Sequence, residues 1–163
     1  MISVIMNIQK KSFFDTNPQK SANKVTINSF MMGSLFFILT LIITLDPNKF
    51  SLFVIYQLVL AIPLLFVSSL AYSKVGYYQH VSDWDTLGWF TNTMGNLFII
   101  NAIGLLTSKF DKTLALLYFL LFLILMIVYT YFNIKHNKEK LGQKLFKLLF
   151  LIVIIVLGGV LLI

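Results

Sequence analysis

The sequence predicts an all-α membrane protein, a bundle of five transmembrane helices with a cytoplasmic N-terminus and an external C-terminus. Of its 163 residues, 58% are hydrophobic and only 12% are charged, whereas a soluble domain carries about 25% charged residues. Apolar stretches close to the roughly 20 residues that cross a bilayer recur five times. Short connections separate them, so consecutive helices are expected to be antiparallel neighbours. This length suits one domain, with residues 1–28 as a cytoplasmic N-terminal segment and 29–163 as a single transmembrane domain.

The N-terminal segment, residues 1–28, spreads four lysines over a polar stretch. A signal peptide would place an apolar run directly after its first basic residues, so none is predicted. Two readings remain open, an amphipathic helix on the membrane surface and a solvated tail. The first span is expected near 27–45 and ends at the turn Asp46-Pro47-Asn48.

The remaining spans are expected near 50–72, 86–107, 113–134 and 145–163. Pro63 lies close to the middle of the second span. It should kink that helix, and the carbonyl it frees should face protein. The fourth span is almost wholly Leu, Ile and Phe, and the fifth contains Gly158-Gly159, which allows a close approach between helices.

The third span is the most polar, and the chain is organised around it. On a helical wheel its small and amide residues gather on one side: Gly88, Asn92, Gly95, Asn96 and, further along the row, Gly104. Asn101 lies on roughly the opposite side and, with Gln57 of the second span, gives a possible second polar face. Small residues let helix backbones approach closely, and an amide in hydrocarbon needs a partner. The row therefore predicts a helix–helix seam or the lining of a polar cavity.

Just before this span, His80, Asp83 and Asp85 gather in the stretch 80–85. Imidazole and carboxylates can hold a divalent metal, and two carboxylates can share acid–base work. The favoured reading is structural: Ser82 and Asp85 have the spacing of a capping box, and acidic groups suit a helix N-terminus. No metal site and no catalytic residue are therefore predicted.

Lysines predict the orientation. With five spans and the N-terminus inside, cytoplasmic segments hold ten lysines and external ones three. A cluster near the start of the fifth span is expected to meet anionic lipid headgroups: Lys135, Lys138, Lys140, Lys144 and Lys147. The formal charge of +7 is therefore attributed to the membrane surface and not to nucleic acid.

Composition narrows the function. There is no cysteine, which excludes disulfides and thiolate chemistry, and every cation is a lysine, which excludes arginine clamps. Apart from Lys147 near the start of the fifth, no Asp, Glu, Lys or His falls inside the five expected spans, which argues against a proton pump. The preferred hypothesis is an interaction or assembly subunit of a homo-oligomer or a larger membrane complex, with no cofactor and no enzymatic activity. The alternative is a small permease or channel for a neutral solute or ion that uses the polar face of the third span. A lipid-modifying membrane enzyme comes third. The preference for Lys, Ile, Asn and Phe hints at a microbial plasma membrane.

Overall fold

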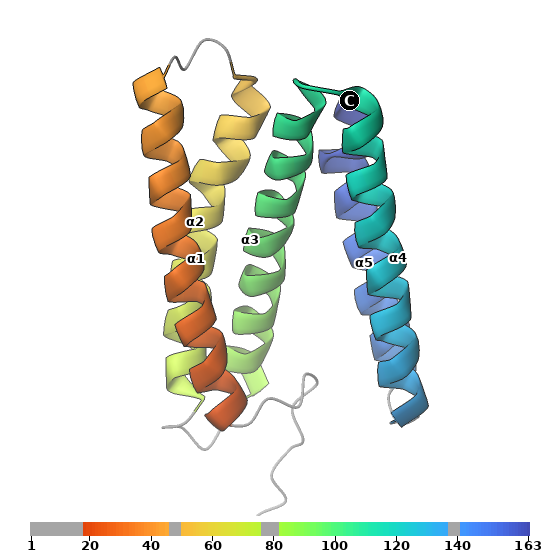
Figure 1. Cartoon of the computed structure of the whole chain (residues 1–163). Helices are drawn as coiled ribbons and strands as arrows, with labels where there is room; N and C mark the ends of the chain where they lie inside the picture. Colours follow the sequence, from red (N-terminus) through yellow and green to blue (C-terminus); the bar gives the residue numbers. More distant parts are fainter. Residues whose placement is uncertain (1–17, 46–49, 76–81, 137–140) are drawn as a thin grey trace, which may run out of the picture.

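A computed structural model describes residues 18–45, 50–75, 82–136 and 141–163. This part of the chain is all-helical and contains five α-helices and a short 3-10 turn. In chain order these are α1 (Pro18–Leu45), α2 (Leu52–Lys74), α3 (Ser82–Ser108), α4 (Lys112–His136), α5 (Leu141–Gly158) and η2 (Val160–Leu162). The helices run up and down beside one another (Figure 1).

Four of the described helices, α1, α2, α4 and α5, are long and apolar enough to cross a membrane. This supports a multi-pass membrane protein by length and composition. The third expected span, 86–107, does form a helix of 27 residues, but α3 is not among the four. Its amides and glycines lower its hydropathy.

The helices form two groups around α3. The most extensive packing joins α2 to α3 and α1 to α2, whereas α4 and α5 pack less extensively, both on α3 and on each other. α3 is thus the central helix, flanked by α1 and α2 on one side and by α4 and α5 on the other (Figure 1). Because the helices alternate in direction, α1, α3 and α5 begin where α2 and α4 end. We call this the lysine-rich end; it is at the bottom of Figure 1.

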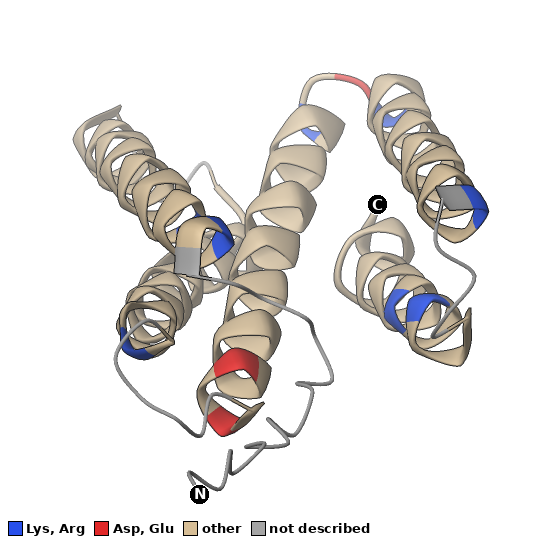
Figure 2. Cartoon of the chain, turned by 90° about the horizontal axis from the view of Figure 1, so that it is seen from below, with Lys and Arg blue, Asp and Glu red and all other residues tan. Residues whose placement is uncertain are grey.

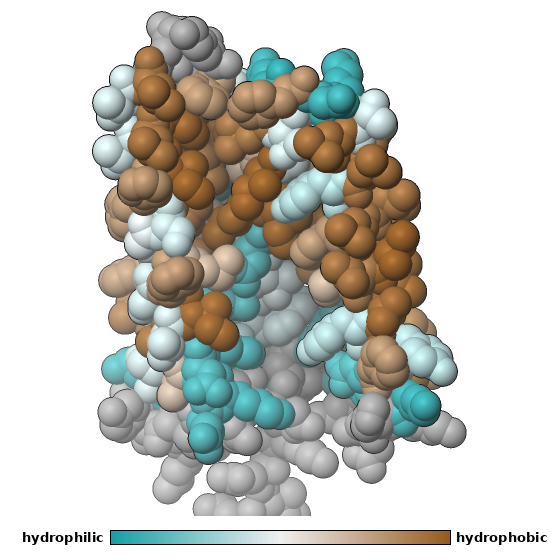
Figure 3. Space-filling model, in the orientation of Figure 1, coloured by the Kyte–Doolittle hydropathy of each residue, from teal (hydrophilic) through white to brown (hydrophobic). Residues whose placement is uncertain are grey.

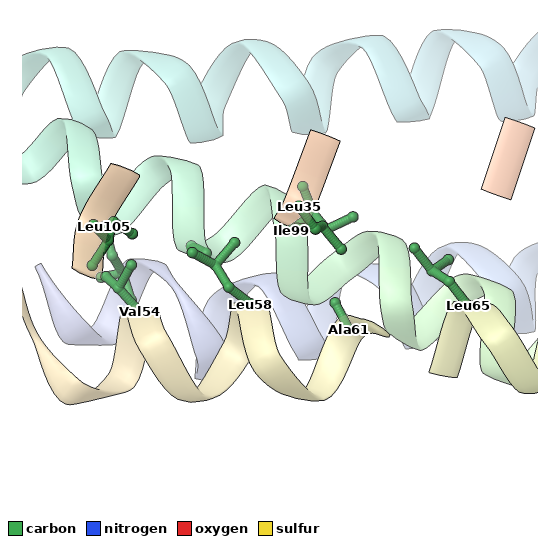
Figure 4. Close-up of a cluster of buried hydrophobic side chains, with 9 residues drawn as sticks. Leu35, Val54, Leu58, Ala61, Leu65, Ile99 and Leu105 are labelled. Carbon is green, nitrogen blue, oxygen red and sulfur yellow. The ribbon is translucent and has the colours of Figure 1, made fainter. Parts of the chain in front are cut away.

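Two apolar clusters hold these groups together. The larger one joins α1, α2 and α3 (Figure 4) and consists of Leu35, Ile42, Val54, Leu58, Ala61, Leu65, Ile99, Ala102 and Leu105. The smaller one joins α3, α4 and α5 through Leu97, Phe119 and Ile155, all almost completely buried. Since lipid offers helices no hydrophobic driving force, such close packing is a main source of helix association in a bilayer.

Three glycines on α3 permit this packing, two of them against α2 and one against α4. A Cβ at Gly88 would lie 2.9 Å from Cε1 of Tyr72, and one at Gly95 would lie 2.9 Å from Cδ2 of Leu65, so both glycines admit side chains of α2. A Cβ at Gly104 would instead overlap the ring of Phe119 on α4. Two different neighbours therefore use the small residues of α3.

Hydroxyl groups on the outer surface are satisfied within their own helix. On α1, for example, Thr40 Oγ1 donates to Phe36 O at 2.8 Å, and Thr44 Oγ1 donates to Thr40 O at 2.7 Å. Such bonds let exposed hydroxyls face hydrocarbon without an unpaired donor. α2 continues through Pro63, and the ring of Pro63 is exposed. This side of α2 therefore does not face the rest of the described bundle, contrary to the expectation for the carbonyl that Pro63 frees. The ring is apolar, so it suits a lipid-facing surface.

The helix boundaries correct one expectation with consequences for function. α1 begins at Pro18 and not near residue 27, so Lys20 and Lys24 lie inside a helix long enough to span a membrane. Pro at the first helical position suits such a start. α1 therefore carries two lysines in its first turns, ahead of the span expected near 27–45.

At the opposite end of the bundle, Asp111 immediately precedes α4. Its Oδ1 accepts hydrogen bonds from the backbone N–H groups of Thr113 at 2.6 Å and Leu114 at 3.1 Å. The backbone N–H groups of Leu114 and Thr113 hold the pKa of Asp111 below its usual value. Asp111 thus caps the helix, as carboxylates commonly do.

Candidate functional site: the polar face of α3

A buried ionisable cluster joins three helices near the lysine-rich end. Lys24 Nζ of α1 donates to the hydroxyl of Tyr72 on α2 at 2.7 Å and lies 4.2 Å from the centre of its ring. Asp85, in the first turn of α3, is completely buried and lies within electrostatic range of Lys24. Burying a lysine is costly unless an anion or a strong acceptor accompanies it. Asp85 and Tyr72 supply both.

A relay of hydrogen bonds continues from this cluster towards the centre of the bundle. Asn28 Nδ2 of α1 donates to Ser68 Oγ of α2 at 3.1 Å, and Ser68 Oγ donates to the Gly88 carbonyl of α3 at 3.0 Å. Asn28 and Ser68 are almost fully buried. With Lys24 and Tyr72, the relay fixes the relative positions of α1, α2 and α3 by polar contacts as well as by packing.

Beyond the relay, α3 presents what we call its amide face, formed by Asp85, Trp89, Asn92 and Asn96. These residues fall within about 60° on a helical wheel. Asn92 and Asn96 are half-buried, and Asn96 Oδ1 is buried with no hydrogen-bond partner in the described part of the chain. Within those residues, the side chain of Asn92 makes no hydrogen bond either. Both amides therefore have unused bonding capacity.

The amide face lies between the two groups of helices. α2 covers the Gly88 and Gly95 side of α3, and α4 covers the Gly104 side. α1 packs on α2 and is not among the helices that pack closely on α3. The surface is recessed in its lower half between α1 and α4, and hydrophilic side chains gather on either side of this recess (Figure 3). We call this feature the hollow.

Aromatic and cationic groups of α5 lie against the start of the amide face. Trp89 and Phe90 each lie 6.0 Å from the ring of Phe150, measured between centroids. Lys147 Nζ lies 5.3 Å from the centre of the Trp89 ring. Viewed from the lysine-rich end, the start of α3 has lysines of α1 and α5 on either side (Figure 2).

A second polar cluster lies at the other end of the bundle. Gln57 Nε2 of α2 donates to the Gly158 carbonyl at 2.7 Å, and Asn101 Nδ2 of α3 donates to the Ile154 carbonyl at 3.1 Å. Both acceptors belong to the last turns of α5, and Gly158, as its final residue, has a carbonyl without a partner further along the helix. A Cβ at Gly158 would overlap Asn101, so this glycine allows the contact. We call this cluster the α5 clamp.

The row predicted on the third span therefore divides between neighbours. Gly88 and Gly95 face α2, Gly104 faces α4, and Asn92 and Asn96 lie on the amide face. The residues proposed as a second polar face, Asn101 and Gln57, are brought together in the α5 clamp.

The acidic stretch is placed only in part, because His80 lies outside the described residues. Asp83 is exposed while Asp85 is buried, and both lie in the first turn of α3. Among the described residues there is no group of three or more His, Cys, Asp or Glu that could hold a metal ion.

The lysines predicted to cluster near the start of the fifth span lie in different surroundings. Lys135 is exposed at the end of α4, Lys144 Nζ donates to the Asn133 carbonyl at 2.7 Å, and Lys147 lies over Trp89. Lys138 and Lys140 lie outside the described residues.

The cluster around Lys24 is a site that sequence reasoning did not identify. Its signal was present: Ser21, Lys24 and Asn28 recur at i, i+3 and i+7, the spacing of one helix face. Extending the first helix back to Pro18 would have revealed that face.

No known protein family, no curated protein and no solved structure matches this chain. The functional argument consequently rests on the chemistry of the described residues.

Proposed function

We propose that this protein is an assembly subunit of a membrane complex, and that it binds its protein partner through Asn92 and Asn96 of the amide face. The partner is either a second copy of this chain or another membrane protein. The observation that carries the proposal is the unused hydrogen-bonding capacity of these two half-buried amides among the described residues.

The proposal treats α3 as a fifth membrane-crossing helix, shielded by its neighbours. α3 has the length of the apolar helices and lies among them, in contact with α2, α4 and α5. With a rise of about 1.5 Å per residue, Asn96 lies about 21 Å from the start of α3, which is near the middle of that helix. Such an amide is therefore expected at the centre of the bilayer.

At that depth the energetics favour a partner. An unsatisfied amide in hydrocarbon costs several kcal/mol, whereas a hydrogen bond between membrane helices contributes about 0.6 to 2 kcal/mol. A polar side chain of another helix entering the hollow would satisfy both Asn92 and Asn96. The glycines of α3 are already occupied by α2 and α4, so they do not offer a packing surface to a partner, whereas the two amides can still form hydrogen bonds.

A photo-crosslinking residue in place of Asn92 tests this proposal in the membranes of producing cells. We expect a discrete protein adduct, at twice the chain mass of 18.7 kDa for a second copy. The matched control is position Asn133, an exposed amide of α4, where no discrete adduct is expected. Crosslinks to lipid alone at position 92 would refute the assembly proposal.

The second candidate is a path for a solute or ion along the amide face. The hollow favours it, because hydrophilic side chains lie on either side of this recess (Figure 3). Against it, Leu97, Phe119 and Ile155 fill the other half of the space between α3, α4 and α5. Conduction would therefore require Phe119 to move away from Gly104. Flux through liposomes that Asn92→Leu abolishes, with folding intact, would favour this candidate over assembly.

A further inference from the structure

Two half-buried lysines from distant parts of the chain lie on either side of the start of α3, at the lysine-rich end (Figure 2). Lys24 comes from α1 and Lys147 from α5. The two lysines are close enough for the charge on Lys147 to repel the charge on Lys24. Lys20 adds a further repulsion, and Asp85 is the carboxylate that attracts Lys24. Asp83, the other acidic residue in the first turn of α3, is exposed on another side of the helix.

An aromatic ring lies against each of the two ammonium groups. Lys24 Nζ lies 4.2 Å from the centre of the Tyr72 ring, and Lys147 Nζ lies 5.3 Å from the centre of the Trp89 ring. These distances are within the range of cation–π attraction. The rings are themselves held: Tyr72 is buried against Gly88, and Trp89 packs on Phe150. The positions of the two ammonium groups are therefore restrained by these contacts, although lysine side chains are long and flexible.

Like charges held close together outside bulk water favour an anion between them, because the surrounding dielectric screens their repulsion poorly. The lysine-rich end of a membrane bundle lies where lipid phosphates are concentrated. The first half of α1 also exposes apolar side chains, including Ile27 at 56% and Phe30 at 76%. These surfaces suit an acyl chain that continues from a phosphate into the bilayer.

From this geometry we propose that the protein binds the phosphate-bearing headgroup of an anionic phospholipid at the start of α3, between Lys24 and Lys147, with Trp89 beside the bound lipid. The site is independent of the protein partner proposed above, since it uses the lysines and not the amides.

The protein contains two tryptophans, which makes this proposal directly measurable. Trp84→Phe leaves Trp89 as the single fluorescent indole, and bromine on a lipid acyl chain quenches an indole that it contacts. The protein is reconstituted into phosphatidylcholine vesicles in which a minor share of the lipid is brominated phosphatidylglycerol or brominated phosphatidylcholine. We expect stronger quenching of Trp89 by the anionic lipid. Replacing Lys24 or Lys147 with Gln should lower the preference about fivefold each, the equivalent of about 1 kcal/mol per lysine.

Three controls make the result decisive. Lys147→Arg keeps the charge and should retain the preference, which separates loss of the site from damage to the fold. Lys135→Gln removes an exposed lysine at the same end of the bundle and should change the preference little. Inorganic phosphate in the buffer should not compete, because a lipid is concentrated in the membrane.

Three outcomes would overturn the proposal. Equal quenching by the two lipids would show that no anionic lipid is selected. Equal losses from Lys135→Gln and Lys147→Gln would show a general surface charge effect. Removal of the preference by free phosphate would reassign the site to a soluble anion.

Discussion

Replacing Gly88 with leucine should separate α3 from α2. A Cβ at this position would lie 2.9 Å from Cε1 and 3.1 Å from Cδ1 of Tyr72, whereas carbon atoms prefer separations of about 3.5–4.0 Å. Tyr72 is only 1% exposed, so its ring has little space into which it can retreat. The three further carbons of leucine would force the helices apart.

The expected cost has two parts. Overpacking a tight contact costs about 1–3 kcal/mol. Moving the ring would also weaken the 2.7 Å hydrogen bond that Lys24 donates to Tyr72, and bonds to charged groups contribute about 1.5–3 kcal/mol. Gly88→Leu should therefore lower the free energy of unfolding by about 2–5 kcal/mol.

Gly33 of α1 provides the matched control. No atom lies within 4 Å of a Cβ built there, so Gly33→Leu should be neutral or gain up to about 1 kcal/mol of helix propensity. The assay is reversible unfolding in mixed micelles, followed by circular dichroism. In the double variant, Tyr72→Ala should restore part of the stability lost in Gly88→Leu by making room for the new side chain. Equal unfolding of the two leucine variants, or strictly additive costs in the double variant, would refute the packing argument.

Three further predictions concern charge. For orientation, an impermeant maleimide applied to intact cells should label a cysteine at Lys109 and not one at Lys138; the opposite pattern would invert the topology. Asp85→Ala should cost about 1–3 kcal/mol by leaving Lys24 without its buried counter-charge, and in a double-mutant cycle this cost should shrink when Lys24 is replaced by Met; an unchanged cost would rule out coupling. Because the pKa of Asp111 is lowered on folding, its cap should stabilise α4 fully above the pKa of about 3.9 of an unfolded aspartate and lose this effect as pH falls through the lower folded value. Comparing wild type with Asp111→Asn across that acidic range checks the sign, since a difference that grows on acidification would contradict it.

Apolar length was enough to predict five helices. The segments near 50–72 and 113–134 correspond closely to α2 (Leu52–Lys74) and α4 (Lys112–His136), because uninterrupted apolar runs have few other solutions in lipid. The start of α1 was misplaced because lysines were treated as loop residues. A long lysine stem can remain helical when its ammonium group finds a partner, as Lys24 does with Tyr72.

The polar residues of α3 were recognisable in advance, but their partners were not. A helical wheel shows which residues share a side, yet it contains no information on which neighbour covers that side. Gly88 and Gly104 were predicted in one row, and the structure directs one to α2 and the other to α4. Lys24 and Tyr72 are 48 positions apart, so their pairing depends on tertiary packing that a single sequence does not display.

The α5 clamp ties the end of the last helix to residues made much earlier during synthesis. Gln57 lies 101 positions before the carbonyl it binds, and Asn101 lies 53 positions before its own. Until α5 docks, the last carbonyls of that helix have no such donors, and hydrocarbon supplies none. Ribosomal synthesis delivers α1, α2 and α3 first, so they present a finished receptor for the α4–α5 hairpin. A hairpin that docks in the wrong register would leave the Gln57 and Asn101 amides without these acceptors, so the clamp favours the correct register.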